Sequence, residues 1–198
     1  MNMHRALAAL ALGGGFLVAI LGTSRPAAPR LDIGADAQEI ARGADHVSAV
    51  RLAEWIRGRR PGLRVIDLRP DSEYEAFHVP TASHVAITGL AGLNPAPDQT
   101  IVLYSGTSAE AAQAWVMVRA LGATHAYYLR GGAEAWAEDI MSPALPEPSG
   151  NKALDSTAAH VGELSRYFGG VPHTGPADFT GDGQDKPVVL KRMRRRGC

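Results

Sequence analysis

The sequence predicts an α/β fold in which helices cover both faces of a parallel β-sheet. Three short apolar segments predict strands: residues 64–68 (RVIDL), 100–105 (TIVLYS) and 125–131 (HAYYLRG). A segment with helical periodicity separates the last two. Strands that are apolar on both faces and alternate with helices are typical of a parallel sheet buried between two helical layers.

The N-terminal segment predicts a membrane anchor ahead of the folded domain. Residues 6–22 are apolar and uncharged, a length near the lower limit for a membrane span. Because no clear cleavage site follows, residues 1–23 are interpreted as an uncleaved signal anchor or transmembrane helix, with a cleaved signal as the alternative. Basic residues flank both sides of the run, which leaves the topology open. The short N-terminal tail favours an extracytoplasmic, periplasmic location for the rest of the chain.

Residues 24–44 are rich in Pro, Ala, Gly and charge, which predicts a linker, and the folded domain is expected over residues 45–148. Ser48 is expected to cap a first helix, whose apolar face carries Leu52, Trp55 and Ile56. Pro61 and Gly62 then predict a turn into the first apolar strand.

Two further helices are expected around the last strand. The first runs from Ser108 to Leu121, and Gly122 is its expected stop. The second runs from Ala133 to Ile140. The three tryptophans of the chain occupy helical positions that face the expected core.

At this point the chain resembles a known family, the rhodanese-like domain, which is a sulfurtransferase-like module. Four blocks carry the resemblance: VIDLRPDSEYEAFHVPTA, IVLYS, AEAAQAWVMVRALG and AYYLRGGAEAW. Phe77 and Thr81 replace two glycines of the family pattern. The matching positions are Asp67, Arg69, Glu73, Tyr74, His78, Pro80, Ala82, Leu129, Gly131, Gly132 and Trp136. The resemblance covers roughly half of the chain and implies a rhodanese-like parallel sheet.

The resemblance also implies that the active-site loop departs from its catalytic form. Active members carry Cys-x-x-Gly-x-Arg, in which the cysteine thiolate holds sulfur as a persulfide. The matching residues are Ser105, Gly106, Thr107, Ser108, Ala109 and Glu110. Serine cannot form a persulfide, and glutamate in place of arginine would repel an anionic sulfur donor. No catalytic residue is therefore expected, and an enzymatic function is disfavoured.

Asp67, Arg69 and His78 are expected to support this loop rather than to take part in chemistry. Asp67 and Arg69 predict an ion pair at a strand end, and His78 is expected to pack beside the loop. Hydrolysis at Ser105 would need a base and an orienting partner, and no Gly-x-Ser-x-Gly elbow is present. The N–H groups at the start of the following helix could still bind a small anion, although Glu110 weakens this interpretation.

Residues 149–198 form a Pro/Gly-rich extension with an irregular, basic tail. The segment STAAHVGELSRYFGG predicts a short helix that docks on the domain or on a partner, with Val161, Leu164 and Phe168 on one side. The tail carries a basic run that predicts binding to an acidic partner or to anionic lipid: Lys191, Arg192, Arg194, Arg195 and Arg196. Three interpretations of Cys198 stay open: an inert thiol, a disulfide-linked dimer, or a mobile sulfur acceptor.

Composition narrows the functional classes. The 198 residues have a formal net charge of +0, which disfavours nucleic-acid binding. The single cysteine excludes an intrachain disulfide and a cysteine-rich zinc site, and neither a metal nor a cofactor is expected. The sequence therefore predicts a membrane-anchored, catalytically inactive rhodanese-like domain that acts as a binding or accessory module in a larger membrane complex. Sulfur transfer or sulfur carriage through Cys198 is the alternative.

Overall fold

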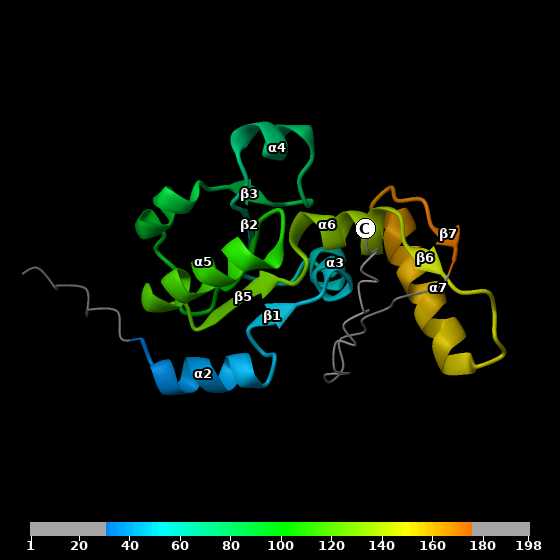
Figure 1. Cartoon of the computed structure of the whole chain (residues 1–198), viewed down its shortest axis with the longest axis horizontal. Helices are drawn as coiled ribbons and strands as arrows, with labels where there is room; N and C mark the ends of the chain where they lie inside the picture. The colour runs from blue at the N-terminus through cyan, green and yellow to red at the C-terminus, as the bar shows by residue number, and fades with distance from the viewer. Residues whose placement is uncertain (1–30, 176–198) are drawn as a thin grey trace, which may run out of the picture. The chain divides into compact units, whose positions relative to one another are not determined.

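A parallel five-stranded sheet forms the centre of the structure, a computed structural model that describes residues 31–175 (Figure 1). The strand order is β1-β5-β4-β2-β3, and every recorded pairing is parallel. The strands are β1 (His46–Val47), β2 (Leu63–Asp67), β3 (Ser83–His84), β4 (Thr100–Tyr104) and β5 (His125–Leu129). The predicted α/β fold with a parallel sheet is confirmed.

Helices cover both faces of the sheet, as predicted. One face packs against α3 (Ala49–Arg57), α6 (Gly132–Trp136), the π-helical turn η2 (Ala137–Met141) and α7 (Lys152–Tyr167). The other packs against the 3₁₀ helix η1 (Ile87–Gly92) and α5 (Ser108–Ala120). The side chains of β4 alternate between the two cores, with Val102 and Tyr104 in the first and Ile101 and Leu103 in the second. This alternation explains why both faces of β4 are apolar.

A capping residue marks the start of α3, and a glycine marks the end of α5, as predicted. The Ser48 hydroxyl accepts a hydrogen bond from the Arg51 N–H (3.2 Å) and caps α3. Helix α5 ends at Ala120, and Gly122 follows with a φ of 96°. A positive φ suits glycine, so the predicted stop lies where the chain leaves the helix.

The predicted linker over residues 24–44 is wrong for part of its length, because α2 (Ile33–Ala41) forms within it. Asp32 caps α2 through a 3.0 Å hydrogen bond from the Ala35 N–H. Arg119 of α5 binds the inward side of α2. Composition missed the helix because its partner is 83 residues away in the chain.

Helix α7 is longer than the short helix expected in the C-terminal extension, because the Asn151 side chain caps it at residue 152. Of the two docking alternatives, the domain or a partner, the structure shows the domain: Leu164 is fully buried, and the Phe168 ring packs edge-on against the Trp136 ring with centroids 5.2 Å apart. The short parallel pair β6 (Ala144–Leu145) and β7 (His173–Thr174) joins the segments on either side of α7.

The helix α4 (Asp71–Ala76) was not predicted and follows the end of β2. No helix within residues 31–175 combines the length and the hydropathy needed to cross a bilayer. The apolar run at 6–22 and the basic tail lie outside the described residues.

Candidate functional site

The loop of residues 105–110 leaves the end of β4 and continues into the first turn of α5. Ser105 is only 2% exposed, whereas Glu110 is exposed in the first turn of α5. The Ser105 hydroxyl donates a 2.5 Å hydrogen bond to the Glu110 carboxylate. Thr107 precedes α5 but makes no side-chain capping bond. The loop therefore closes on its own carboxylate at a helix N-terminus, where negative charge is favoured.

This hydrogen bond directs the Ser105 hydroxyl at a carboxylate, the kind of acceptor that can act as a base. A hydroxyl has one proton, and here that proton is directed at Glu110. The other candidate partners are engaged elsewhere: His78 stacks on Tyr74 and contacts its carbonyl oxygen through Nδ1 (2.9 Å), and Asp67 binds Arg69. Within residues 31–175, the structure shows Glu110 as the acceptor of the Ser105 hydroxyl but no third side chain bonded to Glu110 to orient it as a triad base would be oriented.

The start of α6 holds the loop from the other side. The N–H of Ala133 donates to the Ser105 carbonyl oxygen (2.8 Å), and the N–H of Gly131 donates to the Ser108 hydroxyl (2.7 Å). At Gly132 a Cβ would lie 2.4 Å from the Ser105 oxygen and 2.6 Å from the Gly106 oxygen. The second glycine of the RGG segment is therefore required by close backbone approach.

A buried ion pair stands at the end of β2. Arg69 Nη2 lies 2.7 Å from Asp67 Oδ2, and Nε lies 3.0 Å from Oδ1. Burial alone would raise the pKa of Asp67, but hydrogen bonds from Arg69 and Tyr104 outweigh it and hold the pKa below its usual range. Burial raises the pKa of Tyr104, and its hydrogen bond to Asp67 adds to this shift. Asp67 is therefore a structural carboxylate that stays ionised.

The segment from Phe77 to Ala82 is fixed by this ion pair and by β4. Arg69 donates to the Phe77 carbonyl oxygen (2.5 Å), and the Val79 N–H donates to the Tyr104 hydroxyl (3.0 Å). Thr81 has a φ of 69°, a strained value for a β-branched residue. The side chains of Phe77, His78 and Thr81 remain exposed.

The remaining predicted residues fall in two groups. Cys198 and the four tail arginines, Arg192, Arg194, Arg195 and Arg196, lie outside the described residues. Within residues 31–175, no group of three or more His, Cys, Asp or Glu side chains could hold a metal ion. Sequence reasoning missed Tyr104, which lies in a uniformly apolar strand and yet ties Asp67 to Val79. It also missed the hydrogen bond between Ser105 and Glu110, because a spacing of five residues does not by itself indicate such a contact.

Comparison with known proteins finds one family model that is similar to the central segment. The model of the rhodanese-like domain matches residues 48–139. No curated protein matches the chain.

Several solved structures resemble the chain at low identity. The rhodanese-like domain of a protein from Anabaena sp. is 25% identical and covers 46% of this chain and 72% of that one, with a TM-score of 0.43. A rhodanese-related protein from Thermoplasma volcanium is 20% identical and covers 46% and 88%, with a TM-score of 0.40. A rhodanese-like domain protein from Staphylococcus aureus is 18% identical and covers 48% and 93%, with a TM-score of 0.43. On the family match, residues 48–139 are similar to the rhodanese-like domain, over slightly less than half of the chain.

Proposed function

We propose that this chain is a membrane-anchored, extracytoplasmic rhodanese-like protein that does not transfer sulfur and acts as a binding or accessory subunit of a membrane complex. The observation that carries the proposal is the hydrogen bond from Ser105 to Glu110. A sulfurtransferase loop needs a thiolate and a surrounding that favours an anion. This loop offers a hydroxyl and a carboxylate instead.

The N-terminal apolar run supports the membrane part of the proposal. Residues 6–22 contain no charged residue and are near the length that a membrane-spanning helix requires. In the proposed arrangement they stay attached to the protein, and the rhodanese-like domain lies on the periplasmic side. The chain is then expected to stay with membranes through salt and carbonate washes.

The charge distribution supports an acidic protein partner for the tail. Residues 31–175 contain 17 acidic and 11 basic residues, a net charge of −6. The run from Lys191 to Arg196 is strongly basic by contrast. A neutral chain that concentrates arginines in one short segment has a local positive charge that can bind an anionic surface.

Purification from native membranes in mild detergent tests this proposal. The wild-type chain should retain a protein partner at about 0.1 M salt and lose it at about 1 M, because the screening length falls from about 10 Å to about 3 Å. Glutamine at all four of Arg192, Arg194, Arg195 and Arg196 should release the partner even at low salt.

The matched control is Cys198→Ser, which leaves the tail charges in place and should retain the partner. A partner that stays bound after the four arginines are replaced would show that the tail is not its binding element. If the chain is recovered without any partner at every salt concentration, the proposed accessory role is contradicted.

A further inference from the structure

Helix α2 binds the domain through its acidic side. Asp36 is 8% exposed, and its Oδ1 lies 2.8 Å from Nε and 2.6 Å from Nη2 of Arg119. Glu39 accepts a longer bond from the same guanidinium (3.4 Å). Arg119 also donates to the carbonyl oxygens of Ala123 and Thr124, at 3.2 and 2.6 Å. One arginine of α5 thus binds both carboxylates on the inward side of α2 and offsets one of their two negative charges.

The apolar side of α2 is turned away from the domain. At 100° per residue, five uncharged residues share an arc of about 120°. All five are exposed, and we call them the outer face of α2: Ile33, Gly34, Ala37, Ile40 and Ala41. Ile33 is 71% exposed and Ile40 is 53% exposed. An amphipathic helix on a globular domain ordinarily buries its apolar stripe, so this orientation is reversed.

The position of α2 in the chain indicates what covers the outer face. Ten residues separate Gly22, the end of the apolar run, from Ile33. Fully extended, they span at most about 35 Å, so α2 follows directly on the proposed membrane anchor. In the sequence, Arg30 precedes α2 and Arg42 follows it, and basic residues next to a membrane segment are attracted to anionic headgroups. Arg119 offsets one of the two negative charges of Asp36 and Glu39, which weakens their opposition to that attraction.

A protein partner fits the outer face less well than a bilayer surface does. Two isoleucines, two alanines and a glycine on a nine-residue helix cannot supply the roughly 800 Å² per partner of a standard protein interface. Interfacial binding scales with the apolar area that is buried and sets no minimum area, and the proposed anchor already keeps α2 near the lipid.

We propose that the outer face of α2 lies in the membrane interface and fixes the orientation of the rhodanese-like domain on the bilayer. The proposal rests on the membrane anchoring proposed above. Arg119 transmits the orientation, because it joins α2 to α5, and α5 begins at the loop of residues 105–110. Figure 1 shows α2 (blue) and α5 (green) as separate helices of the same domain.

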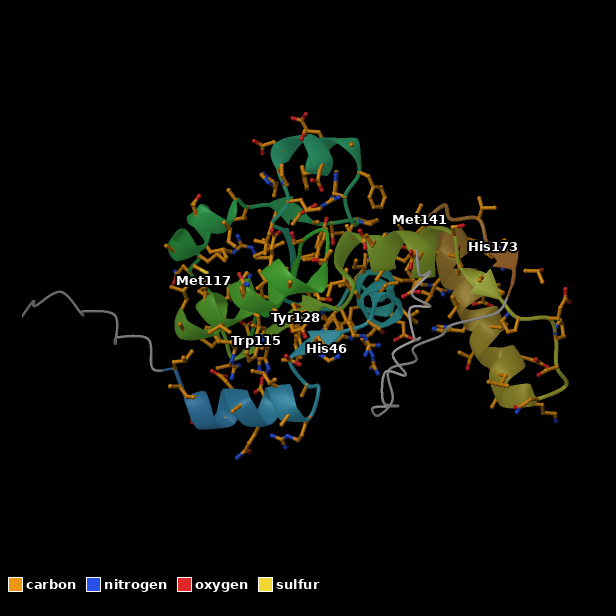
Figure 2. All side chains as sticks on the ribbon, viewed as in Figure 1. His46, Trp115, Met117, Tyr128, Met141 and His173 are labelled. Carbon is orange, nitrogen blue, oxygen red and sulfur yellow. The ribbon has the colours of Figure 1, made fainter. Side chains whose placement is uncertain are left out.

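Lipid-quenching of single fluorescent labels tests the proposal on the full chain in vesicles of phosphatidylcholine and phosphatidylglycerol. In a Cys198→Ser background, the label is attached through Ile33→Cys or Ile40→Cys. The matched control is Met117→Cys, an exposed apolar position on α5 that Figure 2 labels (45% exposed). Lipids with a nitroxide near the headgroup should quench both α2 labels at least twofold more than the control, and aqueous iodide should quench them less.

Flotation of the vesicles separates the two ways in which the test could fail. If the chain floats but the α2 labels respond to lipid nitroxide and iodide as the control does, the orientation proposal alone is overturned. If the α2 labels are shielded from both quenchers, a protein covers the outer face, which also overturns it. If the chain does not float with the vesicles, the anchoring and the orientation proposals both fall.

Discussion

The contact between Ser105 and Glu110 places a carboxylate against the loop of residues 105–110. Glu110 occupies the first turn of α5, where free N–H groups and the helix dipole favour a negative charge. Its carboxylate accepts a 2.5 Å hydrogen bond from the Ser105 hydroxyl. A thiosulfate-like ligand would have to displace this carboxylate and would be repelled by it. The expectation that the loop could bind a small anion therefore loses support.

The first prediction concerns restoring the loop. Ser105→Cys alone should give little sulfur transfer, because the Glu110 carboxylate raises the pKa of a neighbouring thiol and repels the donor. Adding Glu110→Arg should increase thiocyanate formation from thiosulfate and cyanide at least about tenfold, the effect of one pKa unit on the thiolate fraction.

A control separates this local effect from a change in total charge. Ser105→Cys combined with Glu163→Arg makes the same charge change on α7, at a side chain that is 65% exposed. This control should behave like Ser105→Cys alone. If Ser105→Cys alone matched the double change at Glu110, the electrostatic explanation of the loop would be wrong.

The second prediction concerns the ion pair at the end of β2. Asp67→Asn leaves the buried Arg69 guanidinium with only the longer, exposed ion pair to Glu73 (3.8 Å), which should lower the free energy of unfolding by about 3–5 kcal/mol at neutral pH. The folded pKa of Asp67 is lowered, so its contribution is complete above the unfolded value of about 4 and is lost as pH falls through the folded value.

Urea unfolding from about pH 7 to about pH 3 measures this loss. The difference between wild type and Asp67→Asn should shrink as the pH falls. Asp71→Asn is the control, because Asp71 is 84% exposed and its replacement should cost at most about 1 kcal/mol. A difference that stayed constant with pH would show that the charge of Asp67 does not stabilise the fold.

Among the elements, those with local signals were predictable and those that depend on distant partners were not. Ser48 and Gly122 marked an end of α3 and of α5, and both lie where expected. Helix α2 was missed because its inward acidic face depends on Arg119. The start of α7 was missed because Asn151 follows a Pro-rich segment that favoured an irregular extension.

The third prediction tests whether α7 is an integral part of the domain, although the family match ends at residue 139. Leu164 is fully buried, so Leu164→Ala should lower the free energy of unfolding by about 2–5 kcal/mol. Leu154, on the same helix, is 57% exposed, and Leu154→Ala should change the free energy of unfolding by no more than about 0.5 kcal/mol. Equal effects in urea unfolding would mean that α7 does not stabilise the domain.

At the scale of the whole molecule, the sheet brings together polar residues that are far apart in the sequence. The carboxyl ends of parallel β2, β4 and β5 lie along one edge, which places Asp67, Ser105 and Arg130 on neighbouring strand ends. The family resemblance therefore predicted which segments meet. It could not predict which polar atoms pair, because the side chains that depart from the family pattern find new partners.

Thiocyanate formation by the intact chain tests the central claim most directly, namely that this rhodanese-like protein does not transfer sulfur. With thiosulfate and cyanide, the wild type and Cys198→Ser should both give the uncatalysed rate, and Ser105→Cys with Glu110→Arg should exceed it under the same conditions. Thiocyanate formation by the wild type above the uncatalysed rate would contradict the claim. Its loss in Cys198→Ser would then assign the activity to the C-terminal thiol, and its persistence would assign it to the domain.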